Sequence, residues 1–177
     1  MKPRGLVDLA GRAAGLVRAR WILRDCDLGA RVWAGGRVHV EALGSLRIGE
    51  RVQIMGGIVS GELVCGKGAE LVIGPRCIFN YGVSIEATRS VRVGARTQIG
   101  AMTRIRDGDG RSTAPVVIGE DVWLAHGVLV EAGVHIGDGA VVSAGSVVVS
   151  DVPPRSLASG NPARCMPAEL FSRLRRA

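Results

Sequence analysis

A period of six residues runs through most of the chain and restricts its fold more than any other feature of the sequence. From Ile118 to Val148 an aliphatic residue stands at every sixth position, and Gly, Ala or Ser follows four of these residues. The same spacing appears earlier, from Ile73 through Phe79 to Ile85. An amphipathic helix repeats every 3.6 residues and a strand every two, so neither explains the period. The pattern predicts an all-β solenoid of parallel strands, in which three hexads form one triangular coil and the aliphatic residues point inward.

One coil of this solenoid is predicted to carry an insertion. The coil starts at Ile73, Val93, Ile118 and Ile136 are separated by 20, 25 and 18 residues. The longer interval predicts an excursion loop at residues 106–115, with the sequence RDGDGRSTAP. Long loops on a rigid scaffold often carry function. An ordinary β-sandwich is disfavoured, because its turn signals would recur every 8 to 12 residues.

The composition fits a narrow, repetitive core. Of the 177 residues, 47% are hydrophobic and 22% charged, which excludes disorder of the whole chain. Aromatic residues make up only 3%, so the core must consist of small aliphatic side chains. The net charge of +7 suits an anionic partner, such as a phosphate-bearing cofactor or a membrane surface. Nucleic acid is not expected, because single-stranded sites need exposed aromatic side chains for stacking.

The two ends of the chain differ from the repeats and give the predicted domain organisation. Residues 1–25 are expected to form an amphipathic cap helix, with apolar residues every three or four positions and Arg between them. Residues 26–154 form the solenoid, and residues 155–177 form a tail with a short basic helix. The N-terminal helix either closes the end of the solenoid or makes peripheral contact with an anionic membrane.

The cysteines and the N-terminus favour a cytoplasmic protein. The four cysteines contain no CxxC pair and no short metal-binding spacing. The N-terminus lacks the apolar run of a secretory signal, and no stretch approaches about 18 apolar residues. A reducing cytoplasm is therefore the expected location.

Three segments together resemble the hexapeptide-repeat acyltransferases, which include maltose, galactoside and capsule-sugar O-acetyltransferases. They are FNYGVSI at 79–85, the run from IGEDVW to DVPP at 118–154, and SGNPAR at 159–164. The resemblance implies a left-handed parallel β-helix and a homotrimer. It also implies that acetyl-CoA or another acyl-CoA binds between subunits, that a saccharide or small molecule is the acceptor, and that no metal is required.

The resemblance also implies a set of cofactor-binding residues. Trp123 lies beside the expected cleft, and Ala125 and Ala144 fall where the pantetheine arm would run. At the nucleotide end are Val149, Ser150 and Arg164. The Arg164 guanidinium suits phosphate because it can donate two parallel hydrogen bonds. Ser150 departs from the family pattern, in which Lys or Arg is common at this position.

The set of expected catalytic residues is incomplete. Asn80 in FNYG resembles the active-site Asn of the family, but the excursion loop lacks the catalytic His that relatives carry there. Asp107 and Asp109 keep only the acidic part of that motif. Acyl transfer to a hydroxyl needs a base, and His suits this role near neutral pH. His126, at a position facing the cofactor, is therefore one candidate base, and Asp107 or Asp109 is the other.

The leading functional hypothesis is a CoA-dependent O-acyltransferase that acts on a sugar, a glycan precursor or a small metabolite. The missing loop His leaves two alternatives open. One is a catalytically weakened trimeric scaffold or regulator that binds CoA. The other is an N-acyltransferase, because an amine needs less help from a base than a hydroxyl does. The three His of the chain lack a zinc-binding pattern, so metal-dependent hydration chemistry is not expected.

Overall fold

The computed structural model describes residues 4–108, 110 and 112–166, which form one helix and twenty short strands. The helix α1 (Arg4–Ile22) comes first, and the strands then wind into three sheets that we name A, B and C. Sheet A contains β1 (Asp27–Leu28), β4 (Ser45–Ile48), β7 (Glu70–Ile73), β10 (Ser90–Val93), β13 (Val116–Ile118) and β16 (His135–Ile136). Sheet B contains β2 (Trp33–Gly35), β5 (Gln53–Met55), β8 (Ile78–Phe79), β11 (Gln98–Ile99), β14 (Trp123–Leu124), β17 (Val141–Val142), β19 (Leu157–Gly160) and β20 (Ala163–Met166). Sheet C contains β3 (Val38–Ala42), β6 (Gly61–Cys65), β9 (Ser84–Ala87), β12 (Arg104–Arg106), β15 (Leu129–Val130) and β18 (Val147–Val148).

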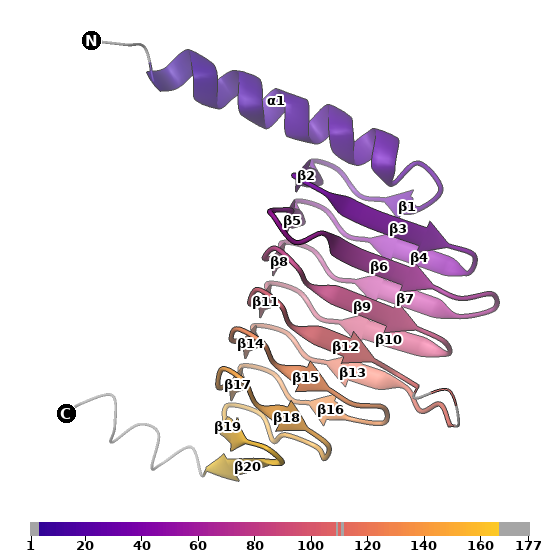
Figure 1. The fold of residues 1–177 in the computed structure, drawn as a ribbon, viewed down its shortest axis with the longest axis vertical. Coiled ribbons are helices and arrows are strands. Elements are labelled where there is room, and N and C mark those ends of the chain that lie inside the picture. The colour runs from indigo at the N-terminus through magenta and orange to yellow at the C-terminus, as the bar shows by residue number, and fades with distance from the viewer. Residues whose placement is uncertain (1–3, 109, 111, 167–177) are drawn as a thin grey trace.

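Each coil contributes one strand to each sheet, and every strand from β1 to β15 pairs in parallel with the strand three places later. Figure 1 shows the coils stacked along the long axis of the molecule. The prediction of a parallel β-solenoid is therefore confirmed. At the C-terminal end, β19 and β20 form an antiparallel hairpin that continues sheet B. The predicted C-terminal helix lies outside the described residues.

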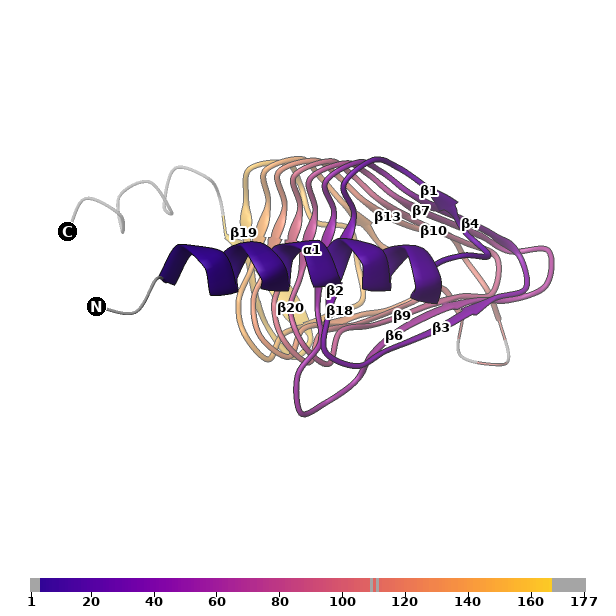
Figure 2. The same cartoon turned by 90° about the horizontal axis from the view of Figure 1, so that it is seen from above.

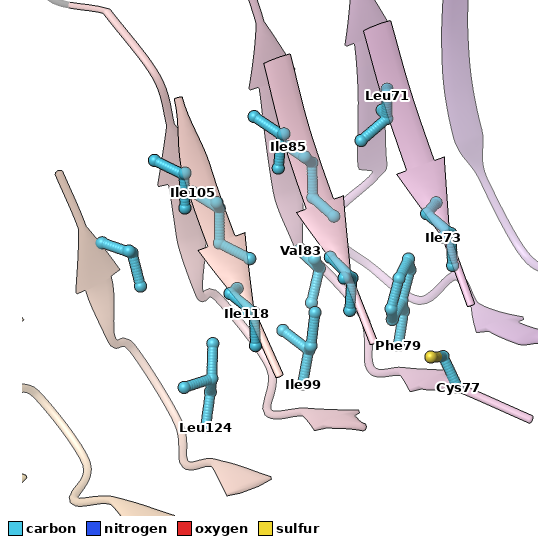
Figure 3. Close-up of a cluster of buried hydrophobic side chains, with 14 of the residues drawn as sticks. Leu71, Ile73, Cys77, Phe79, Val83, Ile85, Ile99, Ile105, Ile118 and Leu124 are labelled. Atoms are coloured by element: carbon cyan, nitrogen blue, oxygen red, sulfur yellow. The ribbon is translucent and has the colours of Figure 1, made fainter. Parts of the chain in front are cut away.

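The core is the column of inward-pointing hexad residues. In sheet B, Phe79 pairs with Ile99, and Ile99 pairs with Leu124. These three side chains are at most 1% exposed, and Figure 3 shows them stacked from neighbouring coils. Burying such a side chain stabilises the fold by roughly 1.5 to 3 kcal/mol. The six-residue period therefore produces one continuous aliphatic interior.

The helix α1 closes the N-terminal end of this column. It lies across the first coil (Figure 2) and buries Ala19 and Leu23. Gly15 lies directly against the indole of Trp33, so that a Cβ at this position would collide with the ring. Gly15 is thus the point of closest approach, and the cap requires its missing side chain. No helix among the described residues is long and apolar enough to cross a membrane.

Two segments leave the regular coils. The predicted excursion loop is present between β12 and β13, where Val91 pairs with Val116. A second, at residues 56–60, joins β5 to β6 and was not anticipated from the sequence. The sequence held a sign of this insertion. Leu46 and Leu71, which pair in neighbouring coils, are 25 positions apart, the same interval as in the coil that carries the excursion loop. Ile58, at the tip of this second segment, is fully exposed.

Two glycines of α1, Gly15 and Gly11, test how the cap is held. We expect Gly15→Ala to reduce the free energy of unfolding by about 1 to 3 kcal/mol, because the added methyl forces α1 away from Trp33. The matched control is Gly11→Ala, whose Cβ has no neighbour within 4 Å. This control should gain up to about 1 kcal/mol from helix propensity. Urea unfolding measures both, and equal effects of the two substitutions would contradict this account.

Candidate active site

Several of the predicted site residues lie along one edge of the solenoid, where sheet B turns into sheet C. We call this edge the B/C corner; it lies on the left-hand side of Figure 1. The corner consists of the residues that follow the sheet B strands, and the strand register stacks them in successive coils. The strands of sheet B pair through Phe79, Ile99, Leu124 and Val142. Two residues after these stand Tyr81, Ala101, His126 and Ala144.

The backbone at the B/C corner has N–H groups that lack hydrogen-bond partners. The carbonyl of Ala101 accepts a hydrogen bond from Gly127 N at 2.8 Å, and that of His126 accepts one from Gly145 N at 2.9 Å. The N–H groups of Ala101, His126 and Ala144 make no hydrogen bond to any described residue. The corner therefore carries a row of free N–H groups, one for each coil.

Small residues keep the His126 and Ala144 part of this row accessible, whereas Ala101 is only 7% exposed. Gly127 and Gly145 both have positive φ, and a Cβ at either would meet no atom within 4 Å. Ala125 and Ala144 add only methyl groups beside them. The exposed imidazole of His126 stands in this open stretch of the corner. The two other His lie on different surfaces, His39 on β3 of sheet C and His135 on β16 of sheet A.

Asn80 and Trp123 lie next to the row. Asn80 donates its backbone N–H to Ile99 O at 2.9 Å, and its half-buried side chain has no hydrogen-bond partner among the described residues. It stands two coils from Ala125 in the same register, which is about 10 Å at the usual strand spacing. Trp123 projects from the middle of sheet B and is 54% exposed.

Arg164 extends the same line toward the C-terminus. It lies on β20 opposite Ser159, which follows Ala158, the partner of Val142. A hydrogen bond of 3.1 Å from Gly160 N to Ser146 Oγ holds this hairpin beside the residue that directly precedes β18 of sheet C. Five strand spacings separate the levels of Asn80 and Arg164, about 24 Å. The structure thus places the predicted phosphate-binding Arg at one end of the line that begins at Asn80.

The remaining site residues lie on a different corner. Val149 and Ser150 follow β18 of sheet C, at the edge where the chain turns back to sheet A. The excursion loop leaves the solenoid from this edge, on the right-hand side of Figure 1. One side of the triangle, roughly 20 Å of extended chain, separates this C/A corner from the B/C corner. Within one chain these residues do not meet His126 or Asn80.

Asp107 has a structural role that the sequence did not indicate. Its fully buried carboxylate accepts hydrogen bonds from Thr88 N at 2.7 Å, Thr88 Oγ at 2.6 Å, Arg89 N at 2.7 Å and also Ser90 N. Burial alone would raise the pKa of this carboxyl, but these hydrogen bonds outweigh it and hold the pKa below its usual value. Such a carboxylate is a poor proton acceptor. The expectation that Asp107 acts as a base is therefore not supported, and Asp109 lies outside the described residues.

The second excursion adds neighbours to the B/C corner that sequence reasoning missed. A Cβ at Gly57 would lie 2.9 Å from the Cβ of Tyr81, and one at Gly82 would lie 3.2 Å from Val59. Ile58, Val59 and Tyr81 are all exposed and form an apolar ridge with Met102. This ridge stands at the N-terminal end of the row of free N–H groups. Among the described residues, no three His, Cys, Asp or Glu side chains gather where they could hold a metal ion.

Comparisons with known proteins agree with this fold. The family model "Bacterial transferase hexapeptide (six repeats)" matches residues 115–150. The structure of PerB from Caulobacter crescentus, solved with CoA and GDP-perosamine, is 30% identical with a TM-score of 0.58, and the match covers 86% of this chain and 67% of PerB. The hexapeptide-repeat acetyltransferase VCA0836 of Vibrio cholerae is 25% identical with a TM-score of 0.58, over 88% of this chain and 80% of VCA0836.

The fold and the stacked corner define a parallel β-solenoid with a row of free N–H groups along one edge. The chain belongs to the hexapeptide-repeat transferase family. Among sequence relatives, the Schizosaccharomyces pombe protein C18B11.09c is 37% identical over 93 residues, which are 50% of this chain and 45% of that protein. A Staphylococcus aureus relative is 52% identical over 50 residues, 28% of this chain and 25% of that protein. The chain thus spans less than half the length of these relatives.

The role of Asp107 can be tested through stability. We expect Asp107→Asn to reduce the free energy of unfolding by about 1 to 3 kcal/mol, because Asn replaces one acceptor oxygen with an NH2 group that faces two of the four donors. The pKa of Asp107 is lower in the folded state than in the unfolded chain. The stability that its carboxylate contributes is therefore fully present above about pH 4 and is lost as the pH falls through the pKa of the folded state. Urea unfolding as a function of pH should show this acid dependence in the wild type and a weaker one in the variant.

The matched control for this measurement is Asp138→Asn. Among the described residues, the exposed Asp138 carboxylate accepts one hydrogen bond, from Glu120 N at 2.8 Å. Its substitution should cost less than about 1 kcal/mol. A larger loss for Asp138 than for Asp107 would show that the buried carboxylate does not hold the excursion in place.

Proposed function

We propose that this protein is an acyltransferase that moves an acetyl group from acetyl-CoA to a hydroxyl of a sugar or a related small molecule. The observation that carries the proposal is the line of the B/C corner, where Asn80, the free N–H groups, His126 and Arg164 follow one another in register. The names of similar proteins support it. PerB was solved with CoA, VCA0836 is described as an acetyltransferase, and C18B11.09c is named provisionally as one.

The residues of this line fit the chemistry of an acyl-CoA. The pantetheine arm is an extended chain with amide carbonyls, which suit the N–H groups of Ala101, His126 and Ala144 as donors. The small side chains of Ala125 and Ala144 leave room for it. Arg164 has no ion-pair partner among the described residues and would hold a phosphate at the nucleotide end. Trp123 would cover the arm from sheet B.

His126 would act as the base for acyl transfer. The thioester supplies an activated carbonyl, and the acceptor hydroxyl attacks its carbon. As the new C–O bond forms, the imidazole takes the hydroxyl proton and later gives it to the departing thiolate when the C–S bond breaks. A free N–H group of the corner would stabilise the oxyanion between these steps. Asn80 would orient the acceptor through its unpartnered amide.

An amine acceptor is the second candidate for the same site. It is favoured by one comparison, because a 29% identical structure is described as a perosamine N-acetyltransferase of Caulobacter crescentus. An amine that reaches the site unprotonated depends less on a base than a hydroxyl does. The effect of substituting His126 therefore separates the two acceptors.

We further propose that the active unit contains several copies of the chain, with three as the expected number. Sheet B is the surface that a second copy would cover, because the outward positions of its parallel strands, β20 excluded, carry no charge. Beyond Trp33, which α1 already covers, these positions are Gln53, Ile78, Gln98, Trp123, Val141 and Leu157. In contrast, sheet A carries the ion pairs of Arg47 and Arg92 with Glu70. Interface centres are depleted in charge, so sheet B fits best.

A second copy would also complete the site. The B/C corner holds Asn80 and His126, whereas Val149 and Ser150 lie on the C/A corner of the same chain. Only the C/A corner of a neighbouring copy could bring the latter residues beside His126. We also expect a cytoplasmic location, because all four cysteines are free thiols, as in a reducing compartment.

Activity can be tested by following thiol release from acetyl-CoA with panels of sugar and amino-sugar acceptors. We expect acceptor-dependent release, and His126→Gln should lower kcat with a hydroxyl acceptor by about 10² to 10⁴-fold. The matched control is His135→Gln on sheet A, also an exposed His, which should retain wild-type turnover. If CoA binds and no acceptor in either panel raises thiol release, the protein is a CoA-binding scaffold.

The oligomer can be tested by introducing one charge into sheet B. Gln98→Glu places a carboxylate at the centre of the uncharged surface and should shift the mass toward a single chain of 18.5 kDa. The control is Val117→Glu on sheet A, where the new carboxylate faces Arg92. Sedimentation velocity distinguishes the species. Association that survives Gln98→Glu but is lost in the control would assign the interface to sheet A instead.

A further inference from the structure

The outer face of α1 exposes large apolar side chains without any cover. The helix turns Gly15 and Ala19 toward the first coil, and on the opposite side Val17 is 70% exposed and Trp21 is 72% exposed. These two residues are four positions apart, so they lie on the same stripe of the helix. An exposed Trp beside an aliphatic residue is unusual on a surface that faces only water.

Cations flank this stripe. Arg18, Arg20 and Arg24 are all exposed, and the sequence contains no Asp or Glu from residue 9 to residue 24. The first acidic residue beyond this stretch is Asp25, whose carboxylate lies 3.5 Å from Arg24. The outer face of the helix is therefore apolar along its middle and cationic along its sides.

A cavity between α1 and the first coil adds to this surface. Its volume is about 200 Å³, and its lining residues are Leu16, Arg20, Leu28, Gly29, Arg31 and Val32. Neither Arg20 nor Arg31 has a hydrogen bond or ion pair with the described residues through its side chain. Arg31 stands at a corner with a φ of 58°, and Arg51 occupies the equivalent corner of the next coil. The cavity thus offers two free guanidinium groups beside apolar walls.

We propose that this end of the solenoid docks onto an anionic lipid bilayer, with α1 lying in the plane of the interface. Val17 and Trp21 would enter the boundary between headgroups and acyl chains, and the Arg side chains would meet lipid phosphates. The cavity of Arg20 and Arg31 would receive one phosphate headgroup. This proposal does not depend on the proposed acyltransferase activity.

The orientation of α1 favours a bilayer over another copy of the chain. The helix lies across the end of the stack rather than along it, so its outer face can meet a flat surface (Figures 1 and 2). The surfaces assigned above to a second copy run along the sides of the solenoid. A symmetric contact between two such ends would also bring Arg18, Arg20 and Arg31 against the same residues of the partner. An anionic surface has the complementary charge.

The test is vesicle sedimentation of the full chain with phosphatidylcholine vesicles, alone or mixed with phosphatidylglycerol. We expect binding only to the mixed vesicles, weakening as salt is raised. Trp21→Ala and the double substitution Arg20→Gln with Arg31→Gln should each weaken binding by about tenfold or more. The matched controls are Trp123→Ala on sheet B and the double substitution Arg104→Gln with Arg155→Gln. Both controls remove exposed groups away from α1, and these variants should bind as the wild type does.

A second measurement keeps the proposal testable if a variant folds poorly. In the Trp123→Phe background, Trp21 is the remaining exposed Trp, because Trp33 lies against Gly15. Its fluorescence should shift to shorter wavelength with mixed vesicles and be quenched by brominated lipids. Failure to bind mixed vesicles, or equal weakening by the controls, overturns the proposal. Binding without any change in Trp21 fluorescence overturns the assignment of α1 as the docking element.

Discussion

Stacking of one coil on the next is the constraint from which the rest of the molecule follows. A short parallel strand cannot satisfy its own backbone groups, so each coil depends on N–H and C=O groups of its neighbours. This register places residues with the same position in the hexad on one line, inside as well as outside. The inner lines form the aliphatic core of Figure 3, and an outer line forms the B/C corner. The candidate site is therefore a row along the solenoid rather than a pocket, and an extended ligand suits it.

The hexad period predicted the inward residues, the parallel sheets and the excursion at 106–115, because each follows from spacing alone. Spacing also put His126 on the line of Ala101 and Ala144. What spacing does not specify is which backbone a side chain meets in the neighbouring coil. The carboxylate of Asp107 holds Thr88, Arg89 and Ser90 of the preceding coil, a contact that only the stacked structure reveals. The role of Gly15 was likewise hidden, since a glycine in a helix normally weakens it and here permits contact with Trp33.

The triangular cross-section explains why one chain would hold only part of the proposed site. Residues on different corners face away from each other at every level of the stack, however long the solenoid becomes. Asn80 and His126 lie on one corner, and Val149 and Ser150 on another. A loop or a second copy must bridge them. The uncharged outer face of sheet B lies next to the B/C corner and gives a copy a surface on which to pack. In the proposed site, association and catalysis are thus linked by the geometry of the coil.

The most direct test of this shared site is subunit mixing. Two variants would be prepared that are each inactive when alone: His126→Gln on the B/C corner and Val149→Glu on the C/A corner. Dissociated together and reassembled in equal amounts, they form some sites in which both halves are wild type. The account predicts that acetyl transfer returns to about a quarter of the wild-type level, the statistical share of such interfaces. Mixed samples that stay as inactive as the separate variants would contradict a site built from two copies of the chain.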